Sequence, residues 1–287
     1  MRKSIAIIIT SILVLSGCNK QQSVSDRLLN EVEKAIAINP DSASNLLKSI
    51  SSPEKLDDKA FARWCMLSGK ITDEIFNSIL PTYQLERAYD WYSSHGSPDE
   101  QVQILIYLGR SYFADGDYDK AMSIYTNALD IAGKNKLNNL IGYTYDYIGD
   151  LYREKFMRTE AIKRYEIAAE YFKKEKNTDS YACALRDIGR EYAQMDSLSH
   201  ALNILIIADS VAANTSNINV TASINNALGN IYSMQNKYDK AEEYLLKALL
   251  TGREKMPDYV ALIDLYTASN SINKAKELLS KIPQDKI

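Results

Sequence analysis

Apolar residues recur at helical spacing in pairs of segments along most of the chain. In the stretch ILIYLGRSYFADGDYDKAMSIYTNAL, Leu105 and Tyr112 fall on one face of a first helix, and Tyr125 falls on the apolar face of a second. The polar run ADGDYD separates the two. Gly116 can adopt positive φ at the end of the first helix, and Asp117 can cap the start of the second. The pattern predicts a helical hairpin.

The same pattern returns every 40 residues. The residues in phase are Gly69, Gly109, Gly149, Gly189 and Gly229; Tyr112, Tyr152, Tyr192 and Tyr232; Ala121, Ala161, Ala201 and Ala241; and Ala88, Ala128, Ala168, Ala208 and Ala248. Chance does not phase four series in this way, so the chain is a tandem array of hairpins. A helical glycine costs about 1 kcal/mol relative to alanine. Its recurrence predicts that a neighbouring helix approaches each of these positions closely.

The spacing of Gly109, Tyr112, Ala121 and Ala128 resembles that of the tetratricopeptide repeat (TPR) family, which places an aromatic residue three positions after a small one and further small residues 12 and 19 positions after it. The resemblance covers roughly residues 60–287. It implies an all-α fold, a right-handed superhelical solenoid of TPR-like hairpins with a mostly 40-residue period. The first helix of each hairpin, here called the A helix, would line the concave face.

The period departs from the usual TPR length of about 34 residues and is also met in HEAT arrays, the alternative interpretation. Gly109 and Ala128 keep the TPR interval of 19 residues, so the six extra residues follow the last alanine and lengthen the second helix and its loop. Tyr232 and Tyr266 are 34 residues apart, so the last repeat has the usual TPR length. These intervals favour TPR over HEAT.

The first repeats depart from this pattern and are degenerate. Thr72 stands in the tyrosine position and Pro81 in the alanine position, so a second helix is expected to begin near Pro81. Upstream, a further hairpin is broken at Asn39 and Pro40. The predicted regions are degenerate hairpins over residues 26–97 and a TPR array of about five hairpins over residues 98–287.

Residues 1–17 have the features of a secretory signal peptide. Arg2 and Lys3 precede the apolar run SIAIIITSILVL, which is shorter than the roughly 20 residues of a membrane span, and the tetrapeptide LSGC ends at Cys18. This tetrapeptide resembles the lipobox of bacterial lipoproteins, in which the signal is removed and the cysteine becomes the diacylated N-terminus. The alternative is an ordinary cysteine in a cleaved signal.

Residues 18–25 would then form a lipidated tether to the membrane. The seven residues after Cys18 reach roughly 25 Å at most, so the array is expected close to the membrane surface. The segment NPDSASNLLKSI resembles the opening of TPR proteins from the envelopes of Gram-negative gut bacteria. By resemblance to enteric lipoproteins, Asn19 favours the outer over the inner membrane. The periplasmic side is favoured over the cell surface.

Composition is that of a folded soluble protein, with 46% hydrophobic and 25% charged residues. The net charge of −3 gives no support to nucleic-acid binding, which usually shows as a basic face. Cys65 and Cys183 lie almost three repeats apart, beyond disulfide reach in a solenoid, and are expected to be small core hydrophobes.

Groups for catalysis or metal binding are sparse. His95 and His200 have no partner at metal-ligand spacing, and the sequence contains no HExxH, CxxC or P-loop motif. Both histidines are expected at the surface. We therefore expect no enzyme, cofactor, metal or small-molecule substrate.

The inward-facing positions of the A helices are candidates for a partner-binding groove. The predicted groove residues are Tyr107, Arg110, Tyr143, Asp146, Asp150, Arg153, Arg186, Arg190, Asn226 and Asn230. In one interpretation, the arginines and asparagines hold the backbone or a carboxylate of a peptide. In the other, Asp146 and Asp150 pair with Arg186 and Arg190 across neighbouring A helices in an intramolecular ladder that contributes little to binding.

The function that these observations favour is a lipid-anchored TPR scaffold that binds a protein or peptide partner in the cell envelope. One alternative is a sensor or regulatory subunit of an envelope signalling system. Another is an accessory lipoprotein of outer-membrane assembly. An enzyme ranks last.

Overall fold

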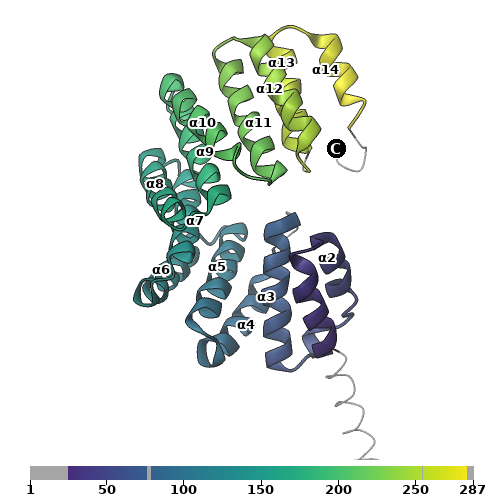
Figure 1. Cartoon of the computed structure of the whole chain (residues 1–287), viewed down its shortest axis with the longest axis vertical. Helices are drawn as coiled ribbons and strands as arrows, with labels where there is room; N and C mark the ends of the chain where they lie inside the picture. Colours follow the sequence, from purple (N-terminus) through teal and green to yellow (C-terminus); the bar gives the residue numbers. More distant parts are fainter. Residues whose placement is uncertain (1–24, 76–78, 254, 283–287) are drawn as a thin grey trace, which may run out of the picture. The chain divides into compact units, whose positions relative to one another are not determined.

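The computed structural model describes residues 25–75, 79–253 and 255–282 (Figure 1). The predicted signal peptide and Cys18 lie outside this part of the chain. Within it, all regular structure is helical, and none of the helices combines the length and hydropathy needed to cross a membrane. The chain divides into two compact units, residues 1–131 and 132–287. The regions predicted from repeat regularity, with a division at residue 98, stay a prediction.

The first unit begins with a helix over residues 25–36. It continues with α2 (Pro40–Lys48), a short 3₁₀ helix η1 (Pro53–Lys55), α3 (Asp58–Ile75), α4 (Thr82–His95) and α5 (Pro98–Ala114); α6 (Tyr118–Asn135) contains the boundary between the units. α2 packs against α3, α3 against α4 and α4 against α5, and α3 also contacts α5. A core cluster that includes Leu29, Leu47 and Leu67 joins the first three long helices.

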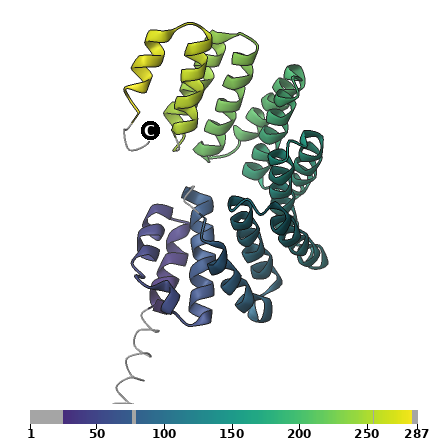
Figure 2. The ribbon, with the colours of Figure 1, turned by 180° about the vertical axis from the view of Figure 1, so that it is seen from behind.

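The second unit is a longer series of the same hairpins. Its helices are α7 (Asn138–Glu154), α8 (Arg158–Lys174), α9 (Thr178–Gln194), α10 (Leu198–Ala212), α11 (Ile218–Met234), α12 (Tyr238–Thr251), α13 (Met256–Ala268) and α14 (Ile272–Leu279). Each helix contacts the next in the chain, and α11 also contacts α9 and α13. The odd-numbered A helices therefore form one layer and the even-numbered helices another, in hairpins that stack side by side (Figure 1 and Figure 2).

The helix boundaries confirm the predicted period. The A helices α5, α7, α9 and α11 begin at residues 98, 138, 178 and 218, and their partners α6, α8, α10 and α12 begin at 118, 158, 198 and 238. The second helix is also longer in the 40-residue repeat, as expected: α6 continues seven residues beyond Ala128, whereas α12, in the last repeat before the shorter interval, ends three residues beyond Ala248. The all-α solenoid of helical hairpins is confirmed.

The turns follow the local signals in the sequence. Gly116 has φ +78°, and the carboxylate of Asp117 accepts a 3.2 Å hydrogen bond from the backbone N–H of Lys120. The side chain of Asn39 caps α2 through the N–H of Ser42 at 3.0 Å. The predicted start near Pro81 is confirmed, since α4 begins at the next residue.

The glycines in phase leave room for a side chain of a neighbouring helix. A Cβ added to Gly109 would stand 2.3 Å from the ring of Tyr125. The equivalent neighbours are Tyr165 at Gly149, Leu205 at Gly189 and Leu245 at Gly229. At these four glycines the predicted close approach is made by the second helix of the same hairpin, whereas at Gly69 it is made by Tyr107 of the next A helix, α5.

The two cysteines of the described chain, Cys65 and Cys183, are free thiols. Cys65 is fully buried, and burial raises its pKa to about 12. Cys183 is half-buried, and burial also raises its pKa. The thiolate forms are disfavoured, so both residues behave as the predicted small hydrophobes.

Candidate functional site: a polar groove on the A helices of the second unit

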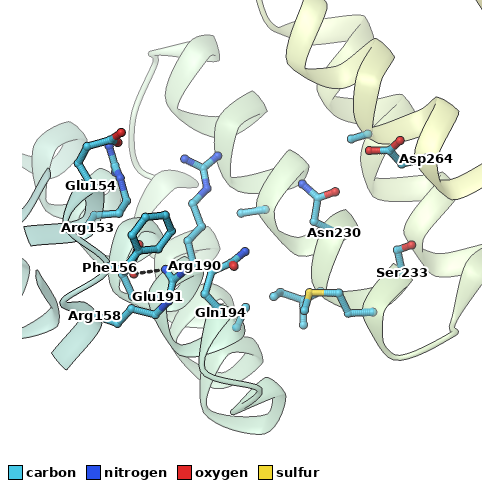
Figure 3. A pocket seen from close by; sticks show the side chains of 15 residues that line it. Arg153, Glu154, Phe156, Arg158, Arg190, Glu191, Gln194, Asn230, Ser233 and Asp264 are labelled. Atoms are coloured by element: carbon cyan, nitrogen blue, oxygen red, sulfur yellow. Dashed lines mark hydrogen bonds and ion pairs between the residues drawn. The ribbon is translucent and has the colours of Figure 1, made fainter. Parts of the chain in front are cut away.

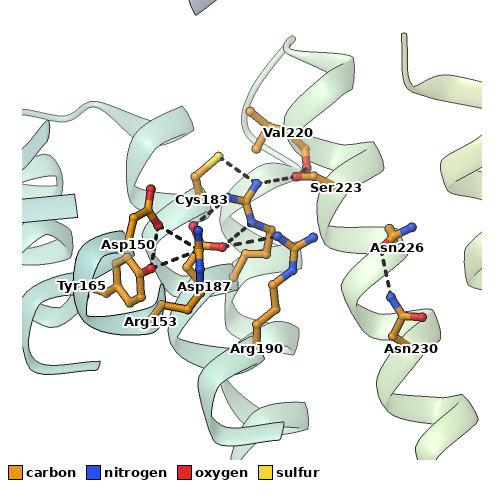
Figure 4. A network of polar contacts seen from close by, with 11 residues as sticks. Asp150, Arg153, Tyr165, Cys183, Asp187, Arg190, Val220, Ser223, Asn226 and Asn230 are labelled. Carbon is orange, nitrogen blue, oxygen red and sulfur yellow. Dashed lines mark hydrogen bonds and ion pairs between the residues drawn. The ribbon is translucent and has the colours of Figure 1, made fainter. Parts of the chain in front are cut away.

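The A helices α7, α9 and α11 bring most of the predicted groove residues into one layer (Figure 4). Residues four apart on a helix share a face, so Asp146 and Asp150 project from α7, Arg186 and Arg190 from α9, and Asn226 and Asn230 from α11. The helical repeat alone produces this arrangement. The contacts that these side chains make were not evident from spacing.

Asp187, which is not among the predicted groove residues, is the centre of the network on α9. The residue is 5% exposed, and its carboxylate accepts two hydrogen bonds from Arg186, at 2.6 and 3.0 Å. Arg186 also donates to the hydroxyl of Ser223 on α11 at 2.9 Å. Burial favours the neutral form of Asp187, but Arg186 and Arg190 outweigh it and lower the pKa of this carboxyl. Arg186 is therefore a structural residue with its donors in use.

A second ionic cluster joins α7 to α8. Arg153 lies 2.8 Å from the carboxylate of Asp150, and the hydroxyl of Tyr165 donates to the same oxygen at 2.7 Å. Arg153 also donates to the Tyr165 hydroxyl at 3.1 Å. Burial and the Asp150 charge raise the pKa of Tyr165 well above its usual value, so it stays a neutral donor.

These contacts differ from the ladder that spacing suggested. In the described structure, Arg186 and Arg190 pair with Asp187 of their own helix, and Asp150 pairs with Arg153 one turn away. The charges are still satisfied within the chain, but mainly inside each helix. The reason is geometric, because Asp187 directly follows Arg186 and their side chains can meet without crossing between helices.

Asp146 lacks such a partner. Its Oδ1 atom is shielded from solvent and has no hydrogen bond in the part of the chain that the structure describes. Burial, followed by the charges of Asp150 and Asp187, raises its pKa, while Arg186 and Arg153 act in the opposite direction. The carboxyl group therefore favours its neutral form more than an exposed aspartate does.

The amides on α11 continue the polar surface toward α13. Asn226 is buried and donates to Asp258 at 2.7 Å, and its side-chain oxygen accepts from Asn230 at 3.0 Å. Asn230 is exposed. Of the two predicted asparagines, Asn226 has a structural contact and Asn230 remains accessible.

A hollow of about 790 Å³ lies along the C-terminal ends of α7, α9 and α11 and extends to α13 (Figure 3). Its lining combines guanidinium groups, neutral polar groups, exposed apolar groups and carboxylates: Arg153, Arg158, Arg190; Gln194, Asn230, Ser233; Phe156, Met234; Glu154, Glu191, Asp264. Three of the predicted groove residues line it, namely Arg153, Arg190 and Asn230. This hollow is the candidate partner-binding site.

Arg190 is the cation of this hollow whose charge is least compensated. Its side chain is 41% exposed and lies 3.4 Å from Asp187, a carboxylate that Arg186 already holds with two shorter bonds. Burial and the neighbouring Arg186 lower the pKa of Arg190 to about 10, which leaves it charged at neutral pH. Arg158, by contrast, forms a 2.9 Å ion pair with the buried Glu191. Arg190 therefore has unused N–H donors that can bind an anionic group in the hollow.

The remaining predicted groove residues make contacts within their own unit. Tyr107 and Arg110, in the first unit, both donate hydrogen bonds to Asp73. Tyr143, in the second, accepts hydrogen bonds from Asn177 and Ser180 at 3.1 and 3.0 Å. Tyr107 is 8% exposed. These contacts place the tyrosines in helix packing.

His95 stacks on Trp91, and His200 stacks on Tyr192. Across the described residues, no group of three or more histidine, cysteine or acidic side chains is arranged to hold a metal ion.

Comparison with known proteins places these hairpins in a class of helical-repeat proteins. Tetratricopeptide repeat models match residues 105–138 and 221–256. The photosystem I assembly protein Ycf3 of Rippkaea orientalis is 32% identical over 91 residues, which are 31% of this chain and 52% of that protein. The match thus spans about half the length of this relative.

Solved structures share the fold at low sequence identity. A Rap protein complexed with Competence and Sporulation Factor has a TM-score of 0.74 and 18% identity, with 91% of this chain and 75% of that chain covered. The apo quorum sensor NprR from B. thuringiensis has a TM-score of 0.57 and 15% identity, with the same coverage. Pseudomonas aeruginosa pilF has a TM-score of 0.52 and 14% identity, with 77% and 90% covered.

The chain therefore carries tetratricopeptide repeats in a TPR-like helical solenoid. Such repeats generally serve as protein-interaction scaffolds, and none of these comparisons indicates a catalytic family.

Proposed function

We propose that this protein is a lipid-anchored TPR scaffold that binds a protein or peptide partner in the envelope of a Gram-negative bacterium. The TPR repeats support the scaffold role. The sequence LSGC after a basic and apolar leader supports attachment through Cys18. Asn19 supports the outer membrane, with the repeats on the periplasmic side.

The observation that carries the binding role is the hollow beside Arg190. Protein-binding surfaces need accessible groups with unused hydrogen-bonding capacity, and Arg190 and Asn230 supply them at one place. A guanidinium and an amide suit a carboxylate and a peptide backbone, respectively. The partner would enter along the A-helix layer of the second unit.

Binding is tested by photo-crosslinking in cells. A photoreactive amino acid at Ser233, inside the hollow, should capture one envelope protein that the same amino acid at Lys163, an exposed position on α8, does not capture. Arg190→Gln should reduce the Ser233 crosslink at least fivefold. The matched control Arg164→Gln, on α8, should leave it unchanged. Equal crosslinking from all of these proteins would reject the hollow as the binding site.

The anchor is tested by mass spectrometry of the full-length protein expressed in a Gram-negative host. We expect an N-terminal peptide that begins at a diacylglyceryl-modified Cys18. The Cys18→Ala variant should lose the modification and membrane association. An unmodified Cys18 in the wild type would reject the lipoprotein assignment while leaving the groove proposal intact.

The identity of the captured partner decides between the scaffold and its alternatives. A partner with its own membrane span, together with a transcriptional change on deletion, would identify a sensor subunit. Depletion of outer-membrane β-barrel proteins in the deletion strain would identify an assembly role, and normal barrel levels would exclude it.

A further inference from the structure

Phe156 has a backbone conformation and an exposure that disfavour phenylalanine. It forms the turn between α7 and α8 with φ +58°, and 78% of its surface is exposed. The equivalent turns, at intervals of 40 residues, use Gly116, Asp196 and Asn236, residue types that adopt the left-handed region at lower cost. A bulky residue in this region indicates strain that the surrounding structure holds in place. Lys136 and Lys176 also adopt positive φ in other turns, so Phe156 is set apart by the combination of this conformation with a largely exposed apolar ring.

The ring stands at the mouth of the hollow next to groups that are rigidly held (Figure 3). The guanidinium carbon of Arg158 lies 5.8 Å from the ring centroid of Phe156. Arg158 is in turn fixed by its 2.9 Å ion pair with Glu191, whose side chain is 2% exposed. Met234, also in the lining, is 47% exposed. Large apolar groups therefore face the same hollow as Arg190.

The charge of the hollow indicates the chemistry that accompanies these apolar groups. Arg158 is neutralised by Glu191, and Arg153 is neutralised by Asp150. The lining as a whole holds three arginines and three carboxylates, the latter including Glu154 and Asp264. The excess of positive charge is local: Arg190 shares the single carboxylate of Asp187 with Arg186, so these three residues carry a net charge of +1. A carboxylate is the complement of this charge among peptide groups.

We propose that Phe156 is a specificity-determining residue that grips a large apolar side chain of a peptide whose carboxylate pairs with Arg190. This inference rests on the proposed function and defines its ligand class as a peptide with an acidic group and a leucine-sized or aromatic side chain nearby. The strained turn keeps the ring at the mouth of the hollow. A bound ligand would remove from water the apolar surface that the ring exposes in the free protein, which favours binding.

The experiment uses the full mature chain and an array of decapeptides. Each peptide carries one Glu, or a Gln in its place, and one Phe, Leu or Ala at one to four positions from it; each is made with a free and with an amidated C-terminus. The proteins compared are the wild type, Phe156→Asn, Arg190→Gln and the control Asp196→Asn, which changes the equivalent turn outside the hollow. Thermal unfolding of each protein is measured in parallel.

We expect the wild type to prefer Phe or Leu over Ala at least tenfold in Glu-containing peptides. Phe156→Asn should abolish this preference, retain the preference for Glu over Gln, and raise the midpoint of unfolding by about 2–4 °C because asparagine relieves the strain. Arg190→Gln should lose the Glu preference. If binding of the Gln peptides depends on a free C-terminus, the terminal carboxylate is the anion.

Two failures are distinguishable. If Phe156→Asn keeps the apolar preference while Arg190→Gln loses the Glu preference, the role of Phe156 is overturned and the proposed groove stands. If the wild type shows no preference for Glu or for a free C-terminus, both are overturned.

Discussion

The ring of Tyr165 lies over Gly149, so close that a Cβ added to this glycine would stand 2.5 Å from a ring carbon. Gly149 is on α7 and the fully buried Tyr165 is on α8, so the contact joins the two helices of one hairpin. The hydroxyl of the same ring is fixed by Asp150. A rigid ring held at both ends cannot yield to a methyl group.

Gly149→Ala should therefore lower the free energy of unfolding by about 1–3 kcal/mol through overpacking, although alanine is the better helix former. Gly133→Ala is the matched control, because no atom lies within 4 Å of its added Cβ and the residue is exposed on α6. That change should stabilise by up to about 1 kcal/mol. Urea unfolding followed by circular dichroism measures both, and a Gly149→Ala protein as stable as the wild type would contradict the prediction.

The same contact shows why the architecture was predictable from the sequence. Glycine, tyrosine and alanine recur at a fixed interval because each hairpin must solve the same packing problem, so the period alone defines the helices. Phe156 interrupts one such series, since glycine, aspartate and asparagine occupy the equivalent turns. A comparison of the four equivalent turn positions in the sequence could therefore have identified Phe156 as unusual.

The polar contacts were less predictable. Helical spacing correctly brought Arg186 and Arg190 onto one face, but the choice between Asp146 and Asp187 as their partner depends on side-chain rotamers that spacing does not determine. The equivalents of Asp187 in the neighbouring repeats are Tyr147 and Ala227, so a charge at a position that is otherwise uncharged was the available signal.

Asp146→Asn should stabilise the protein at neutral pH. The raised pKa of Asp146 means that its charged form is disfavoured in the folded state, chiefly by burial and then by Asp150 and Asp187. An amide of the same shape removes that charge. We expect a higher free energy of unfolding at pH 7, because the amide has no charge whose burial must be compensated.

The pH dependence of this gain follows from the sign of the pKa shift. Below the unfolded-state pKa the carboxyl is neutral in both states and the penalty is absent; above the folded-state pKa it is fully present. The advantage of Asp146→Asn should therefore be larger at pH 8 than at pH 4. Asp150 titrates in the same cluster, so the comparison is made as the difference between variant and wild type at each pH. An advantage that grows as the pH falls would contradict this account.

Asp187→Asn should destabilise the protein strongly, because it leaves the guanidinium of Arg186 buried without its counter-charge. The side chains of Arg186 and Asp187 are 17% and 7% exposed, and breaking a buried pair costs about 3–5 kcal/mol. Arg190→Gln removes a 3.4 Å contact of a side chain that is 41% exposed, and should cost less than about 1 kcal/mol. Urea unfolding of both variants at pH 7 checks the contrast.

The free energy of unfolding of wild type and Asp187→Asn at acidic pH gives a second test, because disruption of the helix alone would not make their difference depend on pH. Arg186 and Arg190 hold the pKa of Asp187 below its usual value, so its contribution to stability is present above the unfolded-state pKa and is lost as the pH falls through the folded-state pKa. The difference between wild type and Asp187→Asn should thus shrink below about pH 4. A constant difference from pH 7 to pH 3 would show that the carboxylate charge does not hold Arg186. In that case Arg186 would no longer be excluded as a ligand-binding residue, and Arg190→Gln alone would be an insufficient test of the hollow.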